Sequence, residues 1–260
     1  MKRFLQILGL TLSISFVSCE KEVVSEMKKL DILSSSLDQF IINNYTIDAK
    51  TIYLNEIKAN VNHPNYNNST IDSAEVNKIL KMLQAVYDLH TPLTDSIFKT
   101  SKIHMHCPAN FRKYILAVKN TELPEIMNLA NDIIPTGNTA FDDIFAAYPV
   151  ATSHPAYPTA YPKLPFIEVT TQKDYNLLPI LKLFKGHPQI DYTESVDFCA
   201  GDGDEIKLTR NGDENTLTFI HGTEDCPSGC MFNQSWVFKI KNGVATFIPY
   251  NYIVEPPMKL

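Results

Sequence analysis

Two short stretches of the sequence contain side chains that could bind a metal ion or carry out redox chemistry. In the first, His104 and His106 are separated by a single residue. If residues 97–107 form a strand, as their pattern predicts, both imidazoles point to the same face. Two imidazoles on one face can begin a zinc or copper site, with His221 or a carboxylate as the third ligand. Two histidines on the polar face of a strand are the simpler explanation of the same pattern.

The second stretch contains a pair of cysteines, Cys226 and Cys230, between two segments predicted as strands. The pair is one residue wider than a thioredoxin-type motif and does not begin a helix, so redox catalysis is disfavoured. Setting aside one cysteine for the N-terminal signal described below leaves four, which in an exported chain favours two disulfides with three possible connectivities. We favour Cys226–Cys230 with Cys107–Cys199, which chain entropy would stabilise by roughly 2 and roughly 4.7 kcal/mol.

Other catalytic templates do not match the sequence. It has no Gly-x-Ser-x-Gly elbow, zinc-protease helix, phosphate-binding loop or dinucleotide fingerprint. The acidic residues 202–205 and 213–214 could bind calcium, but they lack the EF-hand spacing and an acidic turn explains them as well. The sequence therefore predicts no cofactor and favours a protein that is not an enzyme.

The N-terminus has the organisation of a secretory signal. Lys2 and Arg3 precede an almost uncharged apolar run, residues 4–17, which is too short for a membrane-spanning helix. The run ends in a small residue followed by Cys19, which resembles a bacterial lipobox. The resemblance implies cleavage after residues 1–18 and a lipid anchor on Cys19 that holds the chain at the outer membrane of the envelope. The alternative is an ordinary signal peptide, which would leave Cys19 as a free thiol.

The charge of the chain restricts its partners. The formal net charge is −6, and removal of residues 1–18 with their two positive charges makes it −8. An acidic chain without clusters of Lys and Arg argues against nucleic acid as a partner. The remaining candidates are an unknown protein or glycan, with the membrane contacted through the lipid anchor.

Helices are predicted in the first third of the chain. Residues 19–45 carry apolar side chains three and four positions apart, which is typical of a helix that would act as a tether. Asp72 begins a second helix as its N-cap. Ser73 and Ser96 each follow an aspartate and precede an apolar residue, a pattern that resembles Bacteroidetes O-glycosylation sites; the capping role of Asp72 already explains the first of them.

The middle of the chain alternates strands, helices and turns. Residues 97–107 and 111–119 are predicted as two strands joined by a tight turn. The Tyr-Pro-rich residues 149–163 are interpreted as a stiff connector, or else as a polyproline segment that docks into a groove. A strand, a helix and a strand then follow between residues 164 and 196, which indicates a right-handed, ferredoxin-like element. Within it, residues 181–194 are similar to the end of protease propeptide-type inhibitors.

The C-terminal part reads as an antiparallel meander. The pairs Asn211-Gly212 and Asn242-Gly243 each lie between two alternating segments, which is a strong hairpin signal. We therefore expect an α+β fold in which a ferredoxin-like strand–helix–strand element joins a C-terminal antiparallel meander, with an N-terminal helical and mixed half. The predicted organisation is a signal peptide at 1–18, a lipid-anchored tether helix at 19–45, an α+β half at 46–148, a connector at 149–163, and the strand–helix–strand plus meander at 164–260.

The residues from Gly222 to Trp236 carry a wider resemblance. Their Asp-Cys-Pro-Ser-Gly-Cys run followed by Trp-x-Phe is similar to the C-terminal signature of uncharacterised secreted proteins and lipoproteins of Bacteroidetes. The resemblance implies an exported α+β protein and no established activity. The function expected first is a non-catalytic binding module on the envelope, the second a protease inhibitor or propeptide-like protein, and the third a hydrolase of unknown type.

Overall fold

The computed structural model describes residues 37–156, 166–197, 199–224 and 226–249 as an α+β protein. The predicted signal peptide, Cys19 and most of the predicted tether helix lie outside these residues. No helix among those described is long and apolar enough to cross a membrane.

The first described elements are helical. Asp72 caps α3 by accepting hydrogen bonds from the backbone N–H groups of Ala74 and Glu75, as predicted. The predicted strand at 97–107 is wrong. Thr91 caps a helical turn with Pro92 at its first position, which starts a helix where the sequence suggested a break. The helical elements are α2 (Gln39–Ala59), α3 (Ser73–Tyr87), α4 (Pro92–Asp95) and the π-helical turn η1 (Ser96–Thr100).

The C-terminal meander is confirmed as a four-stranded antiparallel sheet. Asn242 and Gly243 have φ angles of 53° and 76°, the left-handed backbone that a two-residue hairpin turn requires. Gly212, at 61°, plays the same part in the other hairpin. The strands, in their order across the sheet, are β5 (Glu205–Asn211), β6 (Glu214–Thr223), β7 (Phe232–Lys241) and β8 (Val244–Ile248).

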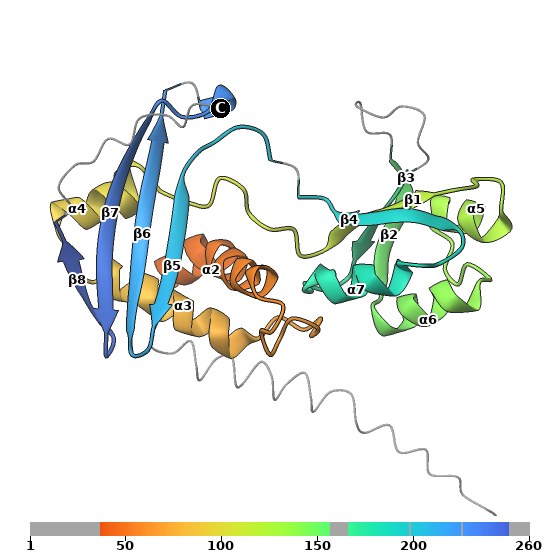
Figure 1. The fold of residues 1–260 in the computed structure, drawn as a ribbon, viewed down its shortest axis with the longest axis horizontal. Coiled ribbons are helices and arrows are strands. Elements are labelled where there is room, and N and C mark those ends of the chain that lie inside the picture. The colour runs from red at the N-terminus through yellow and green to blue at the C-terminus, as the bar shows by residue number, and fades with distance from the viewer. Residues whose placement is uncertain (1–36, 157–165, 198, 225, 250–260) are drawn as a thin grey trace, which may run out of the picture. The chain divides into compact units, whose positions relative to one another are not determined.

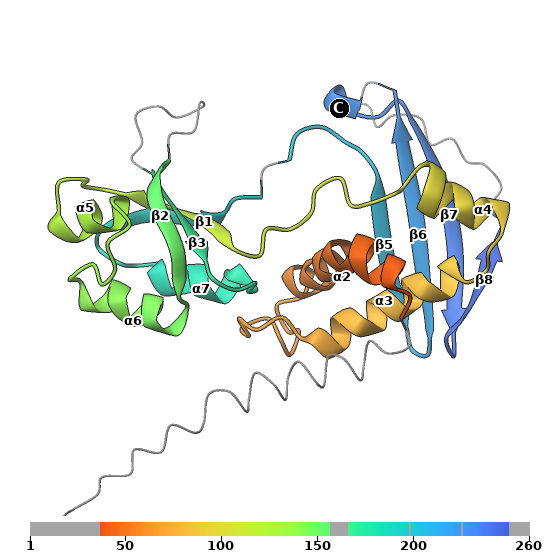
Figure 2. The ribbon, with the colours of Figure 1, turned by 180° about the vertical axis from the view of Figure 1, so that it is seen from behind.

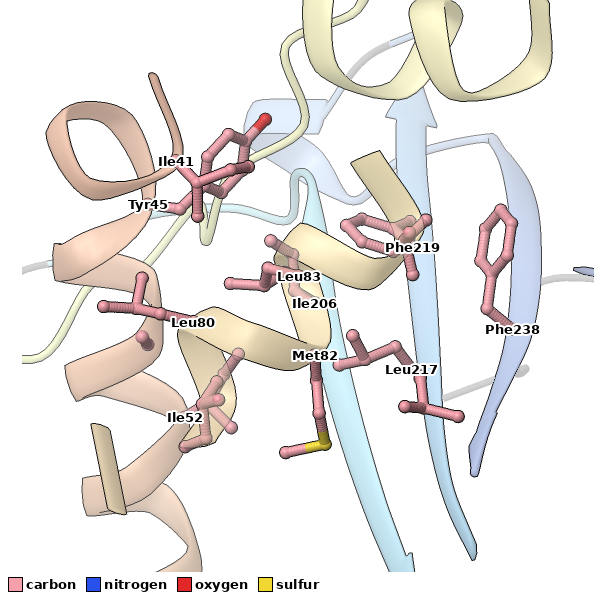
Figure 3. Close-up of a cluster of buried hydrophobic side chains, with 14 of the residues drawn as sticks. Ile41, Tyr45, Ile52, Leu80, Met82, Leu83, Ile206, Leu217, Phe219 and Phe238 are labelled. Atoms are coloured by element: carbon pink, nitrogen blue, oxygen red, sulfur yellow. The ribbon is translucent and has the colours of Figure 1, made fainter. Parts of the chain in front are cut away.

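One face of this sheet forms a core with α2 and α3. On β6 and β7, Leu217 pairs with Phe238 and Phe219 with Trp236, so these side chains share one face, and all four are buried. Figure 3 shows apolar side chains of both helices and of the sheet meeting in this cluster. The opposite face of β6 and β7 carries Thr218, Ile220, Ser235 and Val237 and does not contribute to this core.

The middle of the chain forms a second four-stranded sheet in the order β2-β3-β1-β4. Its neighbouring strands are all antiparallel, and the chain runs strand, helices, strand, strand, helix, strand, which is the split β-α-β arrangement called ferredoxin-like. The helices pack against one face of this sheet (Figures 1 and 2). The elements are β1 (Lys113–Val118), α5 (Pro124–Ala130), α6 (Thr139–Ala147), β2 (Val150–Ala156), β3 (Phe166–Thr171), α7 (Leu177–Phe184) and β4 (Ile190–Ser195).

Part of the predicted Tyr-Pro-rich connector at 149–163 is a strand. Residues 150–156 form β2, and β2 is an edge strand, where Pro155 is tolerated because one side of the strand has no ladder to complete. The remainder of that connector lies outside the described residues. Each predicted half, 46–148 and 164–260, contributes to both hydrophobic cores. The first core joins α2 and α3 with the meander, and the second joins β1, α5 and α6 with β3, α7 and β4.

Candidate functional site

An open groove of about 1110 Å³ lies at the end of the meander where β6 passes into β7. Its wall includes Ile220 and Val237 from the sheet face that α2 and α3 leave uncovered. Met231 and Phe232, at the start of β7, also line it and expose 59% and 50% of their surface. Large apolar side chains that face solvent together in a groove are typical of a ligand-contacting surface.

The connection between β6 and β7 is closed by a disulfide. Cys226 and Cys230 are bonded, with their Cα atoms 3.9 Å apart, and Gly222 lies so close that a Cβ there would collide with the Cys230 sulfur. The backbone N–H of Asp202 donates to the carbonyl oxygen of Cys226 at 2.8 Å, which ties the preceding loop to this connection. The groove therefore has a fixed rim, as the sequence predicted for this loop.

His221 forms a pair with a carboxylate in the same region. Its Nδ1 lies 2.7 Å from Oδ1 of Asp204, and the same oxygen accepts a hydrogen bond from the backbone N–H of Gly222 at 3.1 Å. The carbonyl oxygen of Asp204 accepts from the backbone N–H of His106 at 2.9 Å. Asp204 thus connects three segments of the chain, and its side chain is engaged in holding the rim.

His104 lies in a second pair. Its Nδ1 lies 2.8 Å from Oδ2 of Asp48, a carboxylate of α2 that is 2% exposed. The other oxygen of Asp48 accepts from the backbone N–H of Met105 at 2.6 Å, and the ring of Tyr45 stacks on the imidazole with centroids 4.6 Å apart. Burial, with a smaller contribution from Asp48, raises the pKa of Tyr45 above its usual value. The phenol therefore stays neutral and serves as packing for the histidine.

His106 has a third environment. Its Nε2 lies 3.1 Å from the carbonyl oxygen of Ala200, and its ring packs on Gly203. Next to it Cys107 is bonded to Cys199, with Cα atoms 5.4 Å apart, so both disulfides have the pairing favoured from the sequence.

The three histidines suggested as metal ligands therefore have three different partners. Among the described residues, one group of three histidine, cysteine or carboxylate ligand atoms lies within 4.8 Å of one another, and it belongs to His106, Cys107 and Cys199. His104 and His221 are not part of that group. The sequence did not predict that His104 pairs with Asp48 and His221 with Asp204. One indication was present, because Asp48 is a charged residue at a core position of α2, between Tyr45 and Ile52.

The remaining sequence candidates are two serines and the acidic residues, of which Asp202, Asp204 and Glu205 line the groove. Ser73 is exposed at the start of α3, and Ser96 donates a hydrogen bond to the carbonyl oxygen of Pro92. The carboxylates considered for calcium have individual partners: Glu205 pairs with a lysine at 2.9 Å, and Glu214 with another at 2.9 Å. They do not form a shared cluster among the described residues.

Comparison of the chain with protein-family models, with curated proteins and with solved structures returns no match. Its function is therefore argued from the site itself.

Proposed function

We propose that the protein is a lipid-anchored, non-catalytic binding module of the bacterial envelope, and that it binds its ligand in the groove between the uncovered sheet face and the disulfide-closed rim. The observation that carries this proposal is the pair Met231 and Phe232, exposed side by side on a rim that a disulfide holds in place. A fixed rim lowers the entropic cost of binding, because fewer groups must be ordered when the ligand arrives.

The chemistry of the groove indicates the class of ligand. Ile220 and Val237 give it an apolar floor. Asp202 also lines the groove, whereas Glu205, which lines it too, is paired with Lys207. A polypeptide segment with apolar side chains next to a basic residue would bury the first against the floor and place the second near Asp202.

The arrangement of the polar residues supports binding rather than catalysis. His104 and His221 each pair with their own aspartate, and the carboxylates hold backbone N–H groups as well. A catalytic site needs an acid or base and a nucleophile converging on one point. In the described part of the chain these histidines instead stabilise the segments that frame the groove.

Selection of ligands from a displayed peptide library tests this function. We expect selected peptides to combine apolar and basic residues and to bind Phe232→Ser at least 10-fold more weakly than the unmodified protein. Val244→Ser is the matched control, because Val244 is 65% exposed at the far end of the same sheet. Equal loss in both variants, or none in either, would contradict binding in the groove.

The lipid anchor rests on the sequence at Cys19, and metabolic labelling with palmitate tests it. We expect the label on the unmodified protein and none on Cys19→Ala. Label retained in that variant would contradict anchoring at this residue.

A protease-inhibitor function is the second candidate, because residues 181–194 lie within a complete ferredoxin-like unit, as the end of α7 followed by β4. An inhibition assay against a panel of secreted proteases separates the two candidates. Inhibition at micromolar concentration that survives Phe232→Ser would favour the second candidate; no inhibition would exclude it.

A further inference from the structure

We propose that His106, Cys107 and Cys199 form a zinc site when the disulfide between the two cysteines is reduced, so that the metal replaces the disulfide as a cross-link. His106 and Cys107 lie in the wall of the groove described above, but the zinc site does not rest on the peptide-binding function proposed there. It would hold together the same two segments, the one that follows η1 and the one that precedes β5.

The ligand atoms are already gathered. A ring nitrogen of His106 and the two sulfur atoms lie within 4.8 Å of one another. In a tetrahedral zinc site, Zn–S bonds of about 2.3 Å place two thiolate sulfurs roughly 3.8 Å apart, and the Zn–N bond is about 2.0 Å. Opening the disulfide and separating the sulfurs by a side-chain rotation reaches this geometry without moving the backbone far, since the Cα atoms are 5.4 Å apart.

The imidazole of His106 is held in the orientation and tautomer that a ligand needs. A carbonyl oxygen can only accept, so the contact of Nε2 with the carbonyl oxygen of Ala200 at 3.1 Å assigns the proton to Nε2 and makes Nδ1 the unprotonated nitrogen. Metal-binding histidines commonly donate their other ring N–H to a carbonyl oxygen in this way. Gly203 packs against the Cγ and Nδ1 side of the ring so closely that a Cβ there would overlap these atoms, so a larger residue would shift the imidazole.

The Cys226–Cys230 disulfide provides an internal comparison. It too is bonded in the structure, but no histidine or carboxylate joins it in a group of three ligand atoms among the described residues. Two thiolates alone bind zinc less well than two thiolates with an imidazole. The proposal is therefore specific to the first pair.

Formation of the site begins with reduction of the Cys107–Cys199 disulfide. A dithiol reductant supplies two electrons and two protons, is itself oxidised to a disulfide, and leaves thiols on Cys107 and Cys199. A phosphine supplies the two electrons and becomes a phosphine oxide, while one water molecule supplies both its oxygen and the two thiol protons. Zinc then displaces the two thiol protons, which pass to solvent, while His106 contributes its lone pair without losing a proton. Exposure of His106 and Cys107 allows both reductant and metal to reach the site.

Cobalt substitution tests the proposal. The full chain with Cys19→Ser, Cys226→Ser and Cys230→Ser retains only the two cysteines of interest; it is reduced with a phosphine and titrated with Co²⁺. We expect one Co²⁺ per chain, with thiolate-to-cobalt charge-transfer absorption that Zn²⁺ removes. His106→Ala in this background should weaken binding by about 10–100-fold, and Gly203→Ala should weaken it less, because that variant keeps the imidazole and only displaces it.

His154→Ala, which changes an exposed histidine of β2, is the control and should leave the affinity unchanged. Far-ultraviolet circular dichroism of the reduced proteins establishes that each variant is folded at the start of the titration. Loss of the fold on reduction would overturn the proposal, because the site would not exist without the disulfide. Equal Co²⁺ affinity with and without His106, or the same absorption from a chain that keeps only the Cys226–Cys230 pair, would overturn it as well.

Discussion

Removal of the buried carboxylate of Asp48 should destabilise the fold strongly. One carboxylate oxygen of Asp48 lies 2.8 Å from Nδ1 of His104, and the other accepts a hydrogen bond from the backbone N–H of Met105 at 2.6 Å. Asp48 is 2% exposed. Hydrogen bonds to a charged, buried acceptor contribute roughly 1.5–3 kcal/mol each. The His104 side chain is 40% exposed and can bind water when its partner is removed, so its share lies at the lower end. For Asp48→Ala we therefore expect a loss of about 3–4 kcal/mol in the free energy of unfolding.

Asp48→Asn separates the two contributions. The amide oxygen still accepts from Met105, whereas the charge that pairs with His104 is gone, so we expect a loss of about 1–2 kcal/mol. Asp213→Ala is the control, since Asp213 is 79% exposed, and should change stability by less than about 0.5 kcal/mol. Equilibrium unfolding in urea measures all three, with the slope expected to stay constant. A cost below about 1 kcal/mol for Asp48→Ala, or equal costs for both Asp48 variants, would refute the reasoning.

Two further predictions concern the connections between distant segments. The Cys107–Cys199 disulfide joins residues 92 positions apart, and the Cys226–Cys230 disulfide joins residues 4 positions apart. Replacing the cysteines by serine should therefore lower the free energy of unfolding, measured in urea, by roughly 4.6 kcal/mol for the first and roughly 1.9 kcal/mol for the second. Equal losses would contradict the chain-entropy account. Burial raises the pKa of Asp174, but hydrogen bonds from Lys50 and Arg112 lower it by more, so the folded-state pKa lies below its ordinary value of 3.8. The stabilisation from this lowered pKa is fully present above pH 3.8 and is lost as the pH falls through the folded-state pKa. Asp174→Asn should therefore be less stable than the unmodified protein at neutral pH and equally stable in strong acid. A difference independent of pH would contradict this origin.

The elements that depend on a few neighbouring residues, such as turns and helix caps, were predicted correctly from the sequence. Asn242, Gly243 and Gly212 specify the two hairpins because few other residues accept the left-handed backbone of a two-residue turn, whereas Asn211 is the last residue of β5. The cap at Asp72 and the strand–helix–strand element between 164 and 196 follow from similar local rules. The disulfide pairing could also be inferred, since five residues enclose one pair and leave the other two cysteines to each other.

Elements that depend on distant contacts were not predicted from the sequence. Residues 97–107 were predicted as a strand, and only 102–106 alternate polar and apolar side chains. Ile97 and Phe98 instead enter the core from a π-helical segment, because the capped turn before them sets the direction of the chain. The partner of His104 lies 56 residues away and that of His221 lies 17 away, and no spacing rule connects such residues. The metal hypothesis grouped three histidines on the assumption of a strand that does not form.

Backbone amide chemical shifts on titration with a selected peptide test the central claim most directly, because they locate the ligand on the protein. We predict that the largest shifts fall on the groove, at Ile220, Phe232 and Val237, and that residues of β1 and β3 shift little. The largest shifts on the ferredoxin-like sheet, with none at Phe232, would contradict a binding site in the groove and would favour the inhibitor-like surface instead.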